Sequence, residues 1–335
     1  MKKVLKKIGK VMLGLLIALV VFLAGLFIFH NIMKQKEKPL VENPIGQMVE
    51  VDGNEMCIYT EGEGEHTIVF MSGYGTPEPI LDFKPLWSRL TDDYRIVVIE
   101  KFGYGFSDSV DTERSFETIL RQDREALSKL GIEGPFILCP HSMSGIEAML
   151  WEIEYPEEVE AIVGLDIAYP NEYMEWGDEP DGASQMGSAR FLNNIGINRL
   201  FTGDKIAAKL LPAFGTGVLT EEEKDIYKAI IFAKGYNKTL ENETLENDIT
   251  GSKKILENPK PECPVLIFTS LGEGDPNDKE AVEKWRGYAK DYTSDMPNAR
   301  LVELDCGHYV HCFETDKIES EMRSFIEEMD NEKEE

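Results

Sequence analysis

Positively charged residues are scarce in this sequence, in which 35 Lys and Arg residues stand against 62 Asp and Glu residues. The resulting formal net charge of -27 argues against a nucleic-acid partner, because such proteins need a basic face to neutralise phosphates. Acidity alone indicates only a soluble surface that tolerates the monomeric state, so we expect a monomer.

Cysteine is also scarce, and its odd number of five residues does not fit a disulfide scaffold. Cys306 and Cys312 flank a histidine and could pair, but we expect them to be free thiols. Neither a CxxC nor an HExxH pattern occurs, so the sequence predicts no metal site and no cofactor. The glycine-rich stretch Lys101–Asp108 lacks the third glycine and the Lys-Ser/Thr pair of phosphate-binding loops, which argues against a nucleotide.

One long hydrophobic run is present near the N-terminus, from Val11 to Phe29, and it contains no charged residue. As a helix this run is long enough to cross a bilayer, so we expect a transmembrane anchor at 11–30. A cleaved signal peptide shares the basic start, but its apolar core is shorter and is followed by a small-residue cleavage site. No such site follows Phe29, which favours the anchor.

The charges around the hydrophobic run predict its orientation. Residues 1–38 carry a net charge of +7. Because the whole chain has a net charge of -27, residues 39–335 carry -34. Five lysines precede the run and three follow it before residue 39. The positive-inside rule therefore predicts a cytoplasmic N-terminus at 1–10, a single membrane span and an extracytoplasmic globular domain. A polar, proline-punctuated linker is expected at 31–47.

Short apolar runs alternate with helix-like segments over 48–168 and again over 262–329. This alternation predicts an α/β fold with a doubly wound, mainly parallel sheet. The first part opens with a hairpin whose turn is Asp52-Gly53-Asn54. The intervening segment 169–261 lacks the alternation and contains helical patches, so we expect a helical cap inserted into the core. Residues 330–335 form an acidic tail.

The stretch from Pro135 to Pro170 predicts a strand, a sharp turn at Ser142, a helix and a second strand that ends at Asp166. A strand that turns abruptly into a helix exposes the side chain at the turn above the amides of the helix N-terminus. Ser142 is therefore the candidate nucleophile. The glycine-rich segment Ser72–Pro77 follows another apolar strand, where it can supply amide donors to an oxyanion.

The order of the motifs SGYG, FGYGFSDS and PHSMSG, then an insertion, an acidic loop and DCGHYVH, resembles the α/β-hydrolase superfamily over residues 48–329. The usual elbow is G-x-S-x-G, whereas Pro140 and Ser144 stand here in place of its two glycines and Gly145 comes one position later. The resemblance implies a serine hydrolase with a catalytic triad. The expected oxyanion donors are the backbone amides of Tyr74 and Met143.

A serine nucleophile needs a base within hydrogen-bond reach, and the chain has five histidines. His30 borders the membrane, His66 opens a strand and His141 directly precedes the nucleophile, which leaves His308 and His311. His308 follows a glycine just after the last strand, as the catalytic histidine does in the resembled superfamily. We therefore expect His308 to be the base and His311 to be a structural neighbour.

The acid of the triad has more than one candidate. The superfamily usually takes it from the loop after the strand that begins at Val265, where Asp275 fits, while a count without gaps reaches Glu273. Asp166 instead ends the strand after the nucleophile helix, a position that resembles the acid of pancreatic-type lipases. We place Asp166 first and keep Asp275 and Glu273 as alternatives.

The resemblance implies cleavage of a carboxylic ester or a related acyl bond through an acyl-enzyme, without a cofactor. The substrate is then a small-molecule ester or acyl compound, and the membrane is a partner through the N-terminal helix. Relatives with this arrangement include aminopeptidases that release N-terminal proline, which stay an alternative. A non-catalytic, membrane-tethered binding protein with the same fold is the other alternative.

Overall fold

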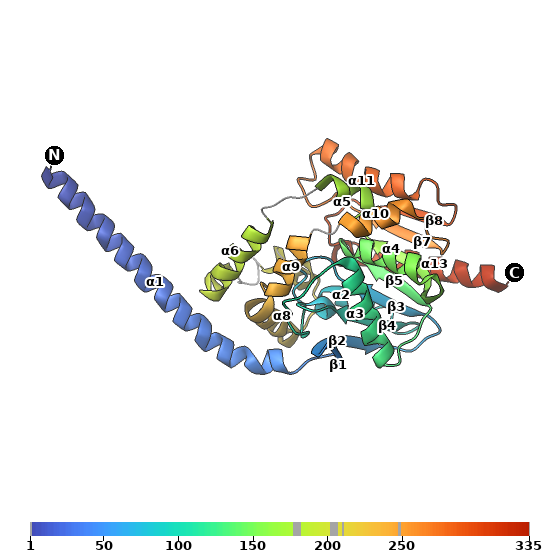
Figure 1. Cartoon of the computed structure of the whole chain (residues 1–335), viewed down its shortest axis with the longest axis horizontal. Coiled ribbons are helices and arrows are strands. Elements are labelled where there is room, and N and C mark those ends of the chain that lie inside the picture. The colour runs from blue at the N-terminus through green and yellow to red at the C-terminus, as the bar shows by residue number, and fades with distance from the viewer. Residues whose placement is uncertain (1, 177–181, 202–206, 210, 247–248, 335) are drawn as a thin grey trace.

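An eight-stranded sheet forms the centre of the computed structural model, which describes residues 2–176, 182–201, 207–209, 211–246 and 249–334 (Figure 1). In spatial order the strands are β1 (Gln47–Val51), β2 (Asn54–Glu61), β4 (Arg95–Glu100), β3 (Thr67–Met71), β5 (Phe136–Pro140), β6 (Val159–Leu165), β7 (Val265–Thr269) and β8 (Ala299–Glu303). β2 pairs antiparallel with β1 and β4, and all other neighbours are parallel. This is the mainly parallel, doubly wound sheet that the sequence predicts.

Helices cover both faces of the sheet, which explains why its central strands are apolar without alternation. All residues of β3, β5 and β7 are buried. On one face α3 (Phe116–Lys129), α4 (Ser144–Glu154) and α11 (Lys279–Thr293) pack on the sheet. On the other face lie α2 (Pro79–Trp87) and α13 (Thr315–Glu334). Parallel strands are buried on two sides in this way, so period-two polarity is absent from them.

The edge hairpin forms where the sequence places it. Asp52 and Gly53 connect β1 to β2 with φ angles of 51° and 77°. Positive φ at both central positions is the feature of the primed turns that match the twist of a hairpin. Two further short helices complete the core, η1 (Pro156–Glu158) and α12 (Val310–Phe313).

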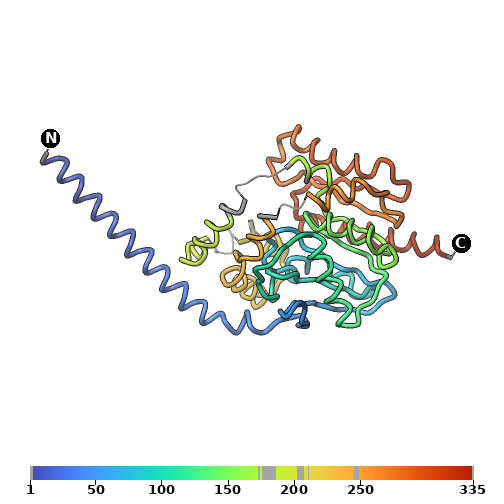
Figure 2. Tube along the Cα trace, viewed as in Figure 1, coloured from blue at the N-terminus to red at the C-terminus, as the bar shows by residue number. Residues whose placement is uncertain are grey.

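The segment expected to be a cap contains only helices among its described residues. These are α5 (Pro170–Trp176), α6 (Gly182–Asn194), η2 (Ile197–Phe201), η3 (Pro212–Gly215), α8 (Glu221–Lys234), α9 (Lys238–Glu246) and α10 (Ile249–Glu257). α6, α8 and α9 lie between the sheet and the N-terminal helix, as the trace in Figure 2 shows. α10 packs instead against α4 and α5.

The N-terminal helix α1 (Lys2–Glu42) is continuous, and its N-terminal part projects away from the rest of the molecule (Figure 1). It is long and apolar enough to cross a membrane, with a mean hydropathy of 3.0 in its most apolar window. The segment expected to be a linker at 31–47 is helical as far as Glu42. The reason is tertiary, because this end of α1 packs against α8. The acidic tail is likewise helical, since α13 continues to Glu334.

Candidate active site

Ser142 lies in the turn between β5 and α4, at the carboxyl end of the central parallel strands. Its φ angle is 57°, which is unusual for a residue other than glycine. Three non-glycine residues among those described have a positive φ, and apart from Asp52 in the hairpin they are Ser142 and Asp166. Such strained residues persist only where their surroundings hold them, and they gather at functional sites.

The departure from G-x-S-x-G is accommodated by Ser144. Its buried hydroxyl donates to the Met71 carbonyl at 2.7 Å and to the His141 carbonyl at 2.9 Å, and it accepts from the His141 amide at 3.0 Å. These bonds fasten the elbow to the end of β3. Gly145 supplies the close approach to the neighbouring loop, since a β-carbon there would lie 2.6 Å from Cβ of Ile167. A second glycine at the position of Ser144 is therefore not needed.

His308 and Asp166 meet at the same end of the sheet, although 142 positions separate them. The distance from Nδ1 of His308 to Oδ2 of Asp166 is 2.6 Å, and both side chains are buried. The same carboxylate accepts from the Ser270 amide and hydroxyl, each at 2.6 Å, and from Nε1 of Trp285 at 3.0 Å. These contacts hold the Asp166 carboxylate in a fixed orientation toward the imidazole.

The other two acid candidates lie elsewhere. Asp275 is exposed, and its Oδ1 atom accepts from the amide and the side chain of Asn277 at 2.9 Å. Glu273 reaches the opposite nitrogen of the base, with its Oε1 atom 3.3 Å from Nε2 of His308. Neither carboxylate contacts Nδ1 of His308 in the described structure.

The pKa of His308 is raised above its ordinary value. Burial by itself lowers this pKa, but the hydrogen bond to Asp166 and the charges of Asp166, Glu273 and Glu172 outweigh that effect. Glu172 is itself buried, which raises its pKa to about 7. One of its oxygens accepts from the Tyr169 amide at 3.2 Å, and the other has no partner among the described residues.

The loop after β3 contacts the elbow from the other side. A β-carbon at Gly73 would lie 2.6 Å from Cβ and 3.2 Å from Oγ of Ser142, so only glycine fits here without movement. Tyr74 follows, and its hydroxyl hydrogen-bonds to the Leu240 carbonyl at 3.2 Å. The Gly75 amide donates to the Tyr104 hydroxyl at 3.2 Å. The loop after β3 therefore touches Ser142 through Gly73 and contacts the cap through the Tyr74 hydroxyl.

The two remaining histidines near the site have structural roles. Nε2 of His141 lies 3.2 Å from the His308 carbonyl, which can only accept, so Nε2 carries the proton. Burial, together with the charges of His308 and His311, holds the pKa of His141 well below its ordinary value. Nε2 of His311 lies 3.1 Å from Oδ2 of Asp82 on α2. His311 therefore connects α12 to α2, as a structural neighbour of the site.

Several contacts of the site have no signal in the sequence. Ser270, directly after β7, and Trp285 on α11 hold Asp166, and Tyr104 reaches the loop after β3 from the loop after β4. Each is distant in the chain from the residue that it contacts, so no local motif marks it. The sequence indicates only the loops that carry these residues, because open α/β sheets place their sites at the carboxyl ends of strands.

The comparison with known proteins agrees with the topology. No family model matches the chain. It is 35% identical over 318 residues to the uncharacterized protein YbdG of Bacillus subtilis, which covers 94% of this chain and 96% of that protein. It is also similar to the crystal structure of the epoxide hydrolase VrEH1 from Vigna radiata, with a TM-score of 0.63, 19% identity and coverage of 84% of this chain and 97% of that one. Together with the topology, this likeness shows that the chain has the α/β-hydrolase fold.

A thermophilic esterase from Thermogutta terrifontis is a second solved structure similar to this chain. The TM-score is 0.60 at 17% identity, over 85% of this chain and 99% of the esterase. The two solved structures cover 84% and 85% of this chain, so the shared fold extends over most of its length. Sequence identities this low show only that the fold is shared. The reaction must therefore be inferred from the residues of this chain.

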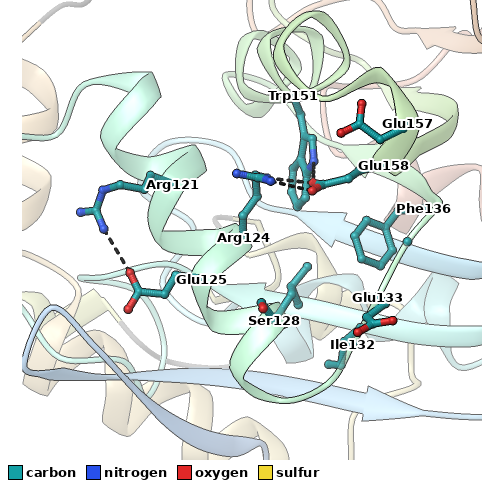
Figure 3. A pocket seen from close by; sticks show the side chains of 12 residues that line it. Arg121, Arg124, Glu125, Ser128, Ile132, Glu133, Phe136, Trp151, Glu157 and Glu158 are labelled. Atoms are coloured by element: carbon teal, nitrogen blue, oxygen red, sulfur yellow. Dashed lines mark hydrogen bonds and ion pairs between the residues drawn. The ribbon is translucent and has the colours of Figure 1, made fainter.

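A cavity of about 480 Å³ lies away from the site, at the other end of β5 (Figure 3). Phe136, which lines it, is the first residue of that strand, whereas Ser142 follows the last. Both of its arginines are engaged: Arg124 pairs with Glu158 and stacks on the ring of Tyr155, and Arg121 pairs with Asp52 and Glu125. Open α/β sheets place their sites at the carboxyl ends of strands, which is the opposite end of β5 from this cavity. The described residues contain no cluster suited to a metal ion.

Proposed function

We propose that this α/β-hydrolase is a membrane-anchored serine hydrolase that cleaves a carboxylic ester or a related acyl bond. Ser142 is the nucleophile, His308 the base and Asp166 the acid. The observation that carries the proposal is the 2.6 Å contact between Nδ1 of His308 and the buried carboxylate of Asp166, next to the strained elbow. A carboxylate, an imidazole and an exposed-turn hydroxyl in this order form the machinery of acyl transfer.

In the proposed reaction Nε2 of His308 takes the proton from Ser142, whose oxygen forms a bond to the substrate carbonyl carbon. The tetrahedral intermediate then loses the alcohol, which leaves with the proton from His308. Water attacks the acyl-enzyme with the same imidazole as base, and the acid product and Ser142 are released. Asp166 holds the tautomer in which Nδ1 carries a proton and stabilises the imidazolium when it forms.

Backbone amides of Tyr74 and Met143 are the proposed oxyanion donors. Met143 is the N-cap residue of α4, so its amide lies at the positive end of that helix. Tyr74 follows Gly73, which touches Ser142. Each such donor contributes on the order of 100-fold to 1000-fold to the rate in related chemistry.

The proposed substrate is an ester with a hydrophobic acyl part. Apolar cap residues, including Phe214 and Tyr227, pack into the core cluster beside α2 and leave a largely apolar cap over the sheet.

The proposed division is an anchor at 11–30, core at 48–168 and 262–329, and a cap at 169–261. In this arrangement α1 crosses the membrane once and holds the catalytic domain on the extracytoplasmic side, where it acts as a monomer.

An aminopeptidase that releases N-terminal proline is the second candidate. It is favoured by the carboxylates of Glu172 and Glu273, which both act on His308 and one of which has an unpartnered buried oxygen. Carboxylates at this position suit the ammonium group of a peptide N-terminus. They suit a neutral ester less well.

The test is activity profiling of the full-length protein in detergent. Ser142→Ala should abolish both labelling by a fluorophosphonate and hydrolysis of p-nitrophenyl esters. Ser144→Ala is the matched control, because that hydroxyl is engaged with two carbonyls; it should keep labelling while losing about 1 kcal/mol of stability. Labelling that survives Ser142→Ala excludes this nucleophile. Esters of different chain length, run beside proline amides, separate the two candidates, and inactivity on all of them with no labelling favours a binding protein.

A further inference from the structure

One part of the cap exposes large apolar side chains beside α1. Outside α1, seven large apolar side chains are exposed in the described residues, and four of them fall within residues 191–201. These four form what we call the cap apolar patch: Phe191, Leu192, Leu200 and Phe201. The exposed fractions are 63% for Phe191 and 53% for Phe201. Single exposed apolar residues are ordinary, but four in one short segment point to a partner.

The segment that carries the patch is attached to α1. Gly196 lies midway between the two pairs, and a β-carbon there would be 2.6 Å from Cβ of His30 and 3.2 Å from the Leu26 carbonyl. Leu26 and His30 are buried as a result. Nε of Arg199 donates to Nδ1 of His30 at 3.0 Å, and its two terminal nitrogens bind the carboxylate of Glu37 at 2.8 and 2.5 Å. The patch therefore has a fixed place along α1.

That place is the end of the apolar run of α1. The run ends at Phe29, and a helix rises about 1.5 Å per residue, so Leu26 is roughly 5 Å inside this end. Most of the run is exposed, as the values of 57% for Val20 and 54% for Phe22 illustrate. The segment that carries the cap apolar patch therefore meets α1 at the end of this exposed apolar run.

We propose that the cap apolar patch docks on the lipid bilayer where α1 leaves it. The proposal rests on the membrane anchor proposed above, and it adds a second attachment through the catalytic domain itself. Phenylalanine and leucine side chains at this depth bury their apolar surface at the boundary between headgroups and acyl chains. A second copy of the chain is a poorer occupant, because the charge of -34 on residues 39–335 opposes close approach.

Docking has a consequence for the site. α6 packs against α9. α9 carries Glu243, which accepts from the Tyr104 hydroxyl at 2.6 Å, and Tyr104 in turn accepts from the Gly75 amide. The bilayer surface, the cap and the loop after β3 are therefore connected through packed helices. The cap is held in one position over Ser142 whenever the patch is seated.

Quenching of tryptophan by brominated lipid acyl chains tests the proposal on the full chain in nanodiscs that hold one copy each. Phe201→Trp places a reporter in the patch, and Phe22→Trp places one in the apolar run as a positive control. Leu256→Trp is the matched negative control, since that exposed residue lies on α10, which packs on α4 and α5. The unsubstituted protein gives the background of its four tryptophans. Equal thermal unfolding midpoints show that each variant is folded.

We expect a loss of reporter fluorescence for Phe201→Trp that is comparable with that of Phe22→Trp, and none for Leu256→Trp. Quenching of Phe22→Trp alone overturns the docking and leaves the anchor in place. Quenching of neither overturns both. If the fluorescence of Phe201→Trp is not quenched by brominated lipid but changes in nanodiscs that hold two copies, the patch contacts a second chain. That result also overturns the proposal.

Discussion

Nε2 of His308 lies 3.3 Å from Oε1 of Glu273, while Nδ1 of the same ring faces Asp166. The imidazole is thus placed between two carboxylates, one buried and one 64% exposed. In the proposed mechanism, Nε2 exchanges Glu273 for the hydroxyl of Ser142. The exposed carboxylate is free to move, and its charge favours the protonated, inactive form of the base.

Replacement of Glu273 by glutamine should move the pH dependence of the reaction. His308 acts as a base only when deprotonated, so kcat/KM rises with pH through its raised pKa. Removal of the Glu273 charge lowers that pKa, and the rise should shift to lower pH by less than about one unit because solvent screens the charge. The measurement is the pH profile of ester hydrolysis. Asp275→Asn in the same loop should leave the profile unchanged; an equal shift in both variants would contradict the assignment.

The identity of the acid gives a second prediction. Asp166→Asn should lower kcat on the order of 1000-fold to 10000-fold, because the amide favours the wrong tautomer of His308. Asp275→Asn should cost less than about twofold, since Asp275 contacts Asn277 rather than the base. Both are measured with a p-nitrophenyl ester at saturating concentration. Losses of similar size in the two variants would mean that neither residue is the acid.

The sequence predicts the sheet, the elbow and the approximate place of the base because each of these depends on local patterns. Apolar runs mark the buried strands, and a turn between a strand and a helix marks Ser142. The hairpin turn at Asp52 depends on residues that tolerate positive φ. These signals are contained in a few neighbouring residues, so they survive without knowledge of tertiary contacts.

The parts that the sequence could not decide depend on distant contacts. Three carboxylates follow strands at the same end of the sheet, and the choice of Asp166 over Asp275 depends on Ser270 and Trp285, which lie more than 100 positions from Asp166. The helical linker depends on the pairing of Glu37 with Arg199 in the cap. Local propensity says nothing about such pairs, and the proline at position 39 argues against the helix that they stabilise.

The loop after β3 provides a third prediction. Gly73→Ala should lower kcat by roughly 100-fold, because the new methyl group would lie 2.6 Å from Cβ of Ser142 and displace either the nucleophile or the oxyanion loop. KM should change less than kcat, since the clash is at the reacting centre. Gly274→Ala is the control, as a β-carbon there meets no atom within 4 Å. Wild-type kcat in Gly73→Ala would show that this loop does not hold the nucleophile.

A buried charge network under the site leads to the last prediction. Nζ of Lys101 binds Glu147 at 2.6 Å, and Arg114 binds Glu243 at 3.4 Å, so two cations and two anions already balance. Asp123 lies among them with Oδ1 unpartnered within the described structure. Burial, with the Glu147 charge acting in the same direction, raises the pKa of Asp123 to about 8.

The raised pKa means that Asp123 is protonated in the folded protein over a pH range where the unfolded chain has lost the proton. Its contribution to stability is therefore fully present below the ordinary value of 3.8 and is lost as pH rises through about 8. Asp123→Asn replaces the neutral carboxyl by a neutral amide, so it should flatten this decline and raise the unfolding midpoint at pH 8.5 by a few degrees, about 2–4 °C for each kcal/mol gained.

The check is thermal unfolding of the full-length protein in one detergent at several pH values. Asp92→Asn, on an exposed turn, should follow the wild-type curve. A lower midpoint for Asp123→Asn at every pH would instead mean that the folded protein needs the ionised carboxylate to hold Lys101 and Arg114.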